Sequence, residues 1–188
     1  MSIHEKKHAG LVEGKVVLVT GAGAGLGRAT ALLLAEEGAK VVVTDWAQQD
    51  GMDTLKVIKD AGGEAAFVLM DISKEEDIKA GIQFAIDTYG RLDCAVNNAA
   101  MEQERAVPMD EFSDEEWDRL MLVNLKGCFW CVKHEANAML KNGGGSIVNI
   151  SSIDGFKTPG PGYGLYDTAK AGVIHMTKAA AKDYGKTA

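Results

Sequence analysis

Short, wholly apolar runs alternate with longer helix-like segments along this chain of 188 residues. Runs that are apolar at every position suit strands buried on both faces, and regular alternation of strands and helices builds right-handed βαβ units. The sequence therefore predicts an α/β fold, a doubly wound parallel sheet in three layers, formed as one domain over 1–188. Strands are expected at 15–20, 40–45, 64–71, 92–98 and 144–152, and helices at 28–38, 53–63, 73–90, 113–140 and 164–185.

Local signals mark where two of these helices begin. Ser73 and Ser113 are each followed three residues later by a glutamate, Glu76 and Glu116. This spacing is typical of a capping box, in which the serine and glutamate side chains accept hydrogen bonds from amides at the start of the helix. We therefore expect both serines to be helix N-caps.

The composition limits the class of partner. The net charge is −7 at pH 7, which disfavours nucleic acid or an anionic membrane but allows a small anionic ligand at a local site. No apolar run approaches the ~20 residues of a membrane span, and the polar N-terminus lacks a signal-peptide core. We expect a cytoplasmic protein whose residues 1–12 form a flexible tail.

The cysteines and histidines give no sign of metal or redox chemistry. Cys94, Cys128 and Cys131 make an odd count, and the last two form a C-x-x-C inside a predicted helix. Redox motifs of that spacing stand instead at a strand-to-helix turn. The four histidines are scattered without metal-ligand spacing. The sequence thus predicts reduced, structural thiols and no metal site.

A glycine-rich loop, TGAGAGLG at 20–27, follows the first predicted strand and leads into the first helix. The G-x-G-x-x-G pattern is absent because position 26 is Leu26, and the spacing uses Gly21, Gly25 and Gly27 instead. Glycines permit a tight turn and let the backbone approach a pyrophosphate at a helix N-terminus. The loop suggests a dinucleotide site, although a purely structural turn would show the same glycines.

Asp45 ends the second predicted strand, 24 residues beyond Gly21. A carboxylate near this spacing reaches the adenosine ribose hydroxyls in dinucleotide-binding folds, and the alternative is a turn or N-cap aspartate. A carboxylate would repel a 2′-phosphate, and no Lys or Arg stands beside it; Arg28, the nearest basic residue of the loop region, lies inside the helix. NAD is therefore favoured over NADP.

Two tyrosines precede one lysine in YGLYDTAK at 163–170. Tyr166 is four residues before Lys170 and Tyr163 is seven before it, so in a helix either phenol lies on the face of the lysine. A nearby ammonium favours the phenolate and would lower a phenol pKa from about 10. Spacing alone leaves open which tyrosine matters.

Together these motifs resemble the short-chain dehydrogenase/reductase family. One mild departure is Ala100, which stands where the family usually has glycine and could narrow the space near the cofactor. The resemblance implies a Rossmann-like fold. The matching stretches, in the family's order, are TGAGAGLG at 20–27, Asp71, NNAA at 97–100, Asn124, NISS at 149–152 and YDTAK at 166–170.

The resemblance also implies residue roles. The family's Tyr-x-x-x-Lys pattern makes Tyr166 the general acid/base, with Lys170 serving the phenol and the nicotinamide ribose. Ser152 would hold the substrate oxygen, leaving Ser151 structural, and Asn124 would hold a water that links the lysine to solvent. The implied cofactor contacts are Gly21, Gly25, Leu26, Gly27, Asp45, Trp46, Asp71, Ile72, Asn98, Ala99, Tyr166 and Lys170.

Family members continue past the last predicted helix with further strands and a substrate lid, whereas this chain stops at Ala188. The resemblance therefore implies a C-terminally truncated member. Its fifth strand, 144–152, would then be an exposed, apolar edge.

These observations favour an NAD-dependent oxidoreductase that interconverts a secondary alcohol and a ketone. The alternatives are a catalytically impaired dinucleotide-binding fragment, an NADPH-dependent enoyl reductase that uses Tyr163, and a structural subunit. The helices at 113–140 and 164–185 carry more small and apolar residues than one packed face needs. We expect a homodimer or homotetramer through these helices, where the family commonly pairs.

Overall fold

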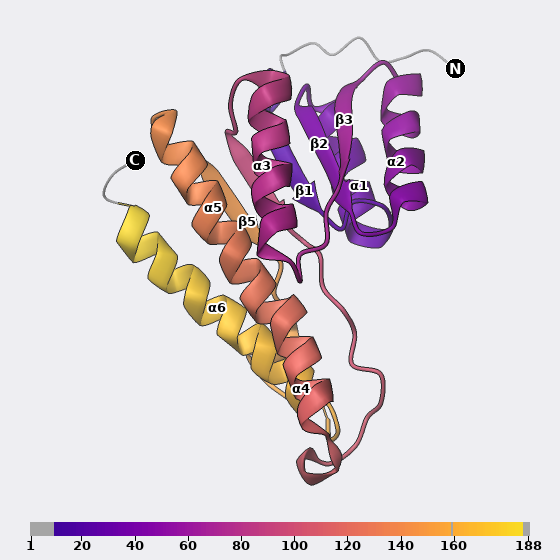
Figure 1. The fold of residues 1–188 in the computed structure, drawn as a ribbon, viewed down its shortest axis with the longest axis vertical. Coiled ribbons are helices and arrows are strands. Elements are labelled where there is room, and N and C mark those ends of the chain that lie inside the picture. The colour runs from indigo at the N-terminus through magenta and orange to yellow at the C-terminus, as the bar shows by residue number, and fades with distance from the viewer. Residues whose placement is uncertain (1–9, 159, 186–188) are drawn as a thin grey trace.

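A computed structural model describes residues 10–158 and 160–185. Its strands form one five-stranded sheet in the order β3-β2-β1-β4-β5, with every pair parallel, which confirms the predicted doubly wound α/β fold (Figure 1). The strands are β1 (Val16–Thr20), β2 (Lys40–Asp45), β3 (Glu64–Leu69), β4 (Cys94–Asn97) and β5 (Ser146–Asn149), and the helices are α1 (Gly25–Glu36), α2 (Gln48–Asp60), α3 (Glu75–Tyr89), α4 (Asp114–Met121), the π-helix η2 (Leu122–Gly127), α5 (Cys128–Lys141) and α6 (Gly164–Tyr184).

β1, at the centre of the sheet, and its neighbour β2 are buried at nearly every position because helices cover both of their faces. Val17 and Val19 of β1 pack into the core formed with α1 and α2. Val16 and Leu18, on the opposite face, pack into the core formed with α3 and α5, which lie toward the viewer in Figure 1. The unbroken valine-rich sequence thus reflects a strand between two helix layers.

The outer strands are shorter and more exposed than expected. β3 ends at Leu69 rather than 71, and β5 covers only Ser146–Asn149 of the predicted 144–152. β5 is the sheet edge, and Val148 on it is half exposed. The prediction of an apolar edge at the fifth strand is therefore confirmed, because the described sheet has no neighbour on that side.

The long helix predicted at 113–140 is helical throughout but is not one regular α-helix. A π-helix, Leu122–Gly127, separates α4 from α5. Its Asn124 is buried, and the side-chain amide exchanges two hydrogen bonds with the backbone of Met101, at 2.8 and 2.9 Å. π-Helical turns inside longer helices are frequently found at functional positions, and this one ties the helix to the loop after β4.

Only one of the two predicted capping boxes forms. The Ser113 Oγ accepts from the Glu116 amide and the Glu116 carboxylate accepts from the Ser113 amide. The prediction at Ser73 was wrong: Lys74 is the N-cap residue of α3, and the Ser73 hydroxyl donates to Asp71 Oδ1 at 2.7 Å. The competing carboxylate two residues earlier turns that serine away from the helix.

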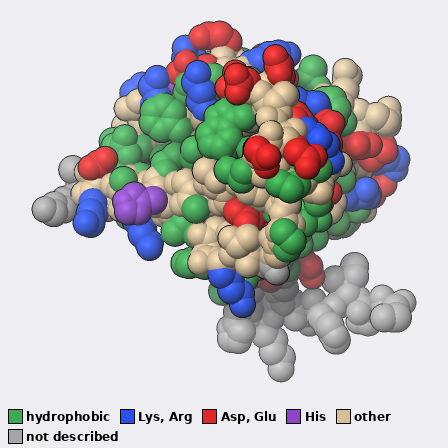
Figure 2. Space-filling model, turned by 90° about the horizontal axis from the view of Figure 1, so that it is seen from below, with side chains coloured by type: hydrophobic (Ala, Val, Ile, Leu, Met, Phe, Trp, Pro, Cys, Tyr) green, Lys and Arg blue, Asp and Glu red, His purple; other side chains and the backbone are tan. Residues whose placement is uncertain are grey.

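Of the predicted tail 1–12, residues 1–9 lie outside the described residues, and the Val12 amide donates to the Glu37 carbonyl. Within the described ranges, no helix is both long and apolar enough to cross a bilayer. On the face seen in Figure 2, acidic, basic and hydrophobic side chains are interspersed. That face therefore carries no large field of a single sign.

We predict that Ser113→Ala lowers the free energy of unfolding by about 1 kcal/mol, the usual effect of losing a serine N-cap. Hydrogen exchange should show faster exchange of the Glu116 amide, which the serine oxygen protects. Ser73→Ala is the control and should leave the first-turn amides of α3 unchanged. Equal effects of the two variants on their helices would contradict the assignment of caps.

Candidate functional site

The glycine loop lies between β1 and α1, at the carboxyl edge of the sheet. Gly21 and Gly25 have φ of +63° and +51°, in the left-handed region that side chains disfavour. A Cβ on Gly27 would collide with the Gly21 carbonyl. The N-cap residue of α1, Ala24, makes no side-chain capping hydrogen bond to the first turn, so the first amides of α1 can meet an anion. Leu26, in this turn, is mostly exposed.

Asp45 lies at the end of β2 beside this loop and is buried. Its Oδ2 accepts from the Gly23 amide at 2.8 Å and its Oδ1 from the Ala47 amide at 2.9 Å. The carboxylate thus holds the glycine loop against the start of α2. Trp46, next to it, is exposed over 78% of its surface, so the indole is free to lie against a ligand.

Residues after β4 close the other side of the loop. The Thr20 hydroxyl accepts from the amides of Asn98 and Ala99 at 3.0 and 2.9 Å. The Asn98 side chain donates to the carbonyls of Thr20 and Gly21. A Cβ on Gly21 would lie 2.9 Å from the Ala99 Cα. Thr20 is a positioning residue that the sequence analysis did not single out, although it begins the TGAGAGLG motif.

The turn after β3 holds Asp71 and Ile72. Burial would raise the pKa of Asp71, but hydrogen bonds from Ser73 and the charge of Lys74 outweigh it, so the pKa lies below its usual value. Ile72 is buried, and its carbonyl lies close to Gly127 of the π-helix. Contact of these two residues with an adenine stays a prediction.

Ser152, Tyr166 and Lys170 come together where β5 and α6 meet. The Ser152 hydroxyl lies near the Tyr166 phenol and acts to lower the pKa of that phenol. The Lys170 Nζ lies 5.6 Å from the Tyr166 ring centroid and donates to the Ile150 carbonyl at 3.0 Å. The lysine is 3% exposed, and burial lowers its pKa.

Ser151 and Tyr163 are arranged differently from Ser152 and Tyr166. The Ser151 Oγ donates to the Lys170 carbonyl at 2.8 Å, which joins the end of β5 to α6. Tyr163 is the N-cap residue of α6 and is 44% exposed. In the structure, therefore, Ser152 lies with Tyr166, whereas the Ser151 side chain bonds to the backbone of α6.

The pKa of Tyr166 is raised, opposite to the direction expected from Lys170. Burial raises it most, and the charges of Asp154 and Glu102 add to the rise, while the nearby Ser152 hydroxyl opposes it. Lys170, whose ammonium donates to the Ile150 carbonyl, does not contribute to this shift. Asp154 and Glu102 were missed from sequence because only the fold brings them near the phenol.

Asn124 reaches the site through the backbone of Met101 rather than through Lys170. Two residues farther along the same loop, Gln103 accepts from the Tyr166 amide at 3.3 Å and donates to the Gly162 carbonyl at 2.5 Å. The loop after β4 is thus tied to the start of α6. The water expected at Asn124 stays a prediction.

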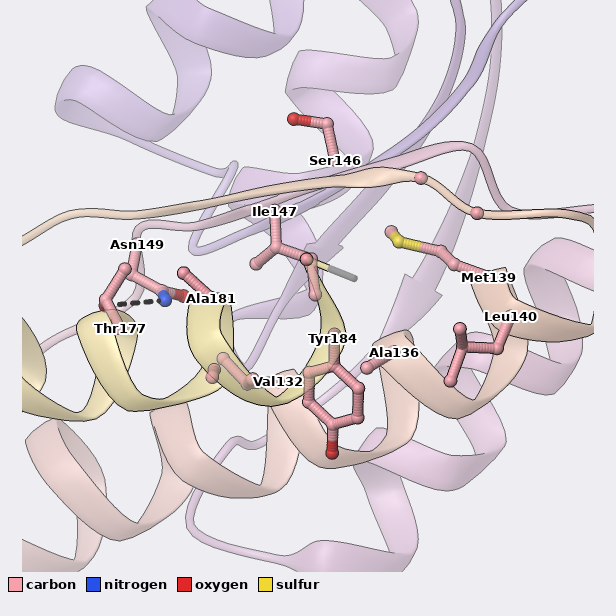
Figure 3. A pocket seen from close by; sticks show the side chains of 14 residues that line it. Val132, Ala136, Met139, Leu140, Ser146, Ile147, Asn149, Thr177, Ala181 and Tyr184 are labelled. Carbon is pink, nitrogen blue, oxygen red and sulfur yellow. Dashed lines mark hydrogen bonds between the residues drawn. The ribbon is translucent and has the colours of Figure 1, made fainter. Parts of the chain in front are cut away.

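A separate hollow of about 260 Å³ opens between α5, β5 and α6 (Figure 3). Its walls are mainly apolar, with the bonded pair Asn149 and Thr177 at one side. The grouping of Ser152, Tyr166 and Lys170 does not line it. The labelled lining residues are Val132, Ala136, Met139, Leu140, Ser146, Ile147, Asn149, Thr177, Ala181 and Tyr184.

The described residues contain no group of three or more His, Cys, Asp or Glu side chains that could hold a metal ion. Cys94, Cys128 and Cys131 are free thiols. Burial raises the pKa of Cys128 to about 12 and that of Cys131 well above its usual value. Such thiols are poor nucleophiles, in line with the predicted structural role.

Comparison with known proteins identifies the family. A family model described as short chain dehydrogenase matches residues 15–188. An uncharacterized oxidoreductase of Thermotoga maritima is 42% identical over 175 residues (92% of this chain, 66% of the relative), and cyclohexanol dehydrogenase of an Acinetobacter strain is 41% identical over 185 residues (96% and 71%).

Among solved structures, carveol dehydrogenase from Mycobacterium avium in complex with NAD aligns with a TM-score of 0.90 at 31% identity, covering 95% of this chain and 68% of that chain. The chain thus spans about two thirds of the length of the relatives it matches. Motif order, sheet topology and these matches lead to one conclusion: the chain belongs to the short-chain dehydrogenase family.

Proposed function

We propose that this protein is an NAD-dependent oxidoreductase that interconverts a secondary alcohol and a ketone. The observation that carries the proposal is the grouping of Ser152, Tyr166 and Lys170 at the sheet edge that also holds the glycine loop. Parallel α/β sheets bind their ligands at this edge. A phenol, a hydroxyl and a buried ammonium together are able to exchange an alcohol proton and stabilise the oxygen that loses it.

The site fits a dinucleotide on three counts. The loop after β1 admits no side chain at Gly27, the first amides of α1 are available to a pyrophosphate, and the Asp45 carboxylate lies beside the loop. We assign the cofactor contacts to the residues given by the family resemblance, with Asp45 and Trp46 at the adenosine ribose and Lys170 at the nicotinamide ribose. NAD, when bound, would accept or return the hydride.

The protein's own residues handle the proton. Tyr166 takes the alcohol proton in oxidation and returns it in reduction, while Ser152 donates a hydrogen bond to the substrate oxygen. The raised pKa of Tyr166 keeps the phenol protonated in the ligand-free chain, which suits its role as the acid in ketone reduction. For oxidation, Lys170 must approach the phenol, and its bond to Ile150 is the contact that would have to lengthen.

The relatives suggest a cyclic substrate. One is named cyclohexanol dehydrogenase and another is a carveol dehydrogenase. We propose cyclic secondary alcohols as the first substrates to test. The enoyl reductase alternative requires Tyr163, which stands partly exposed at the helix start, and the variants below separate the two.

Tyr166→Phe should lower turnover of cyclohexanol with NAD by at least ~100-fold, the smaller end of a general acid/base contribution. Binding of NAD, followed by fluorescence titration, should persist. Tyr163→Phe is the matched control and should keep most of the activity. If Tyr163→Phe abolishes turnover and Tyr166→Phe does not, the enoyl reductase assignment replaces this one.

We predict that the chain binds NAD at least ~10-fold more tightly than NADP, on the order of 1.4 kcal/mol. The Asp45 carboxylate would repel a 2′-phosphate and accept from the ribose. Asp45→Asn should reduce the preference for NAD over NADP. Asp50→Asn, which removes an acidic charge from the first turn of α2, should leave that preference unchanged. Equal dissociation constants of the unaltered chain for the two cofactors would show that Asp45 does not face the ribose.

We further propose a homodimer, with a tetramer as a possible larger assembly, through the segment α4–η2–α5 and through α6. Large apolar side chains remain partly exposed there, including Trp117 and Phe129. A two-fold contact needs only one self-complementary patch.

Sedimentation at micromolar concentration should give about twice the 20.0 kDa chain mass or a multiple of it. Phe129→Glu should shift the distribution toward monomer, and Met52→Glu, an exposed position on α2, should not. A single species near 20 kDa for the unaltered chain would exclude the dimer.

A further inference from the structure

A buried chain of hydrogen bonds links α5 to both β4 and β5 and ends on α6. The Asn97 Nδ2 donates to Glu135 Oε2 and to Asn149 Oδ1, each at 2.9 Å. The Asn149 Nδ2 donates to Thr177 Oγ1 at 2.9 Å, the bond drawn in Figure 3. Glu135 is 0% exposed, and none of the residues assigned above to the cofactor or substrate belongs to this chain of bonds.

Two atoms of this network have no partner among the described residues, Glu135 Oε1 and Asn97 Oδ1. Both are acceptors when the glutamate is ionised, so neither can satisfy the other. The other two atoms of these side chains are already bonded, since Glu135 Oε2 accepts from Asn97 Nδ2. A proton on Glu135 Oε1 makes that oxygen a donor. It can then donate to Asn97 Oδ1, which would complete a cyclic pair of acid and amide.

The surroundings favour that proton. Burial raises the pKa of Glu135 to about 7, and the hydrogen bond from Asn97 opposes it only in part. β4 and β5 present amides to it, and its own helix presents the thiols of Cys128 and Cys131. Lys170 of α6 acts on Cys128 rather than on Glu135.

α3 contributes one more charged group to the surroundings of α5. Glu75 of α3 accepts from Lys133 and lies 2.8 Å from the His134 ring. These two partners hold the pKa of Glu75 at about 2. That charge is thus already paired on α5 and contributes nothing to the pKa of Glu135.

The backbone at Asn97 connects the network to the segment that carries the proposed catalytic groups. Asn97 and Asn149 are the last paired residues of β4 and β5, and the Ile150 amide donates to the Asn97 carbonyl at 2.9 Å. The Ile150 carbonyl then accepts from Lys170. The side chain and the backbone of Asn97 therefore both hold the segment that carries the lysine's acceptor and leads to Ser152.

We propose that Glu135 acts as a positioning residue in its neutral form, donating its Oε1–H to Asn97 Oδ1 and thereby fixing the end of β5 against Lys170. The catalytic consequence rests on the proposed function, but the acid–amide pair does not. The pKa of Glu135 in the folded chain lies above the value of 4.5 for an unperturbed glutamate. The contribution of the protonated Glu135 to the stability of the fold is therefore complete below pH ~4.5 and is lost as the pH rises through about 7.

Thermal unfolding of the full chain without cofactor, between pH 5.5 and 8.5, tests the protonation. Glutamine keeps the size of the acid and carries a permanent donor, so Glu135→Gln should remove a fall in melting temperature that the unaltered chain shows across this range. Glu76→Gln, an exposed acid on α3, is the control and should keep that fall. If the melting temperature of Glu135→Gln falls with pH as it does in the unaltered chain, the proposal that Glu135 is neutral in the folded chain is wrong.

Hydrogen exchange tests the positioning. The protection factor of the Ile150 amide should drop between pH 6 and 8 in the unaltered chain, more than that of Val19 in β1, and should stay constant in Glu135→Gln. Glu135→Leu should have low protection at Ile150 at both pH values. Equal changes at Ile150 and Val19 would reduce Glu135 to a general structural role. Neither measurement uses NAD, so failure of the proposed function would leave both results interpretable.

Discussion

All five strands run parallel, and this single constraint brings the proposed functional groups together. In a parallel sheet every carboxyl end lies at the same edge, so each loop that follows a strand opens on that side. Thr20 and Asp45 are the last residues of β1 and β2, and Asn98 and Ser152 follow β4 and β5, so these residues lie far apart in sequence. Burial of both faces by helices keeps the strands in register, and the register fixes the distances among these residues.

The glycine loop illustrates how backbone packing and side-chain bonding cooperate. The loop is tight because Gly21 takes a left-handed conformation and Gly27 lies against its carbonyl. Asp45 then holds it from the β2 side and Asn98 from the β4 side. The first turn of α1 is left facing outward with amides available, which is the property a dinucleotide site requires.

Burial is the main influence on the titratable groups around α6. It raises the pKa of Tyr166 and lowers that of Lys170, so both shifts favour the neutral form. The same effect acts on Glu135 behind the site. In the ligand-free chain, desolvation therefore outweighs the attraction between phenol and ammonium on which the sequence argument relied.

The sequence by itself determined the order of the elements, the sheet type and the family, because hydrophobic period and motif spacing are local properties of the chain. It also indicated the Ser113 cap correctly, and the Ser113 hydroxyl accepts from the Glu116 amide. Ser73 has the same spacing, but Asp71 takes its hydrogen bond, and only the folded turn brings that carboxylate close enough. The Asn124 side chain of the π-helix likewise bonds to the backbone of Met101, a residue 23 positions away, so only the fold reveals its partner. The pairings of Ser152 with Tyr166 and of Glu135 with Asn97 were decided by tertiary structure, because side chains on different elements meet only after the sheet has packed.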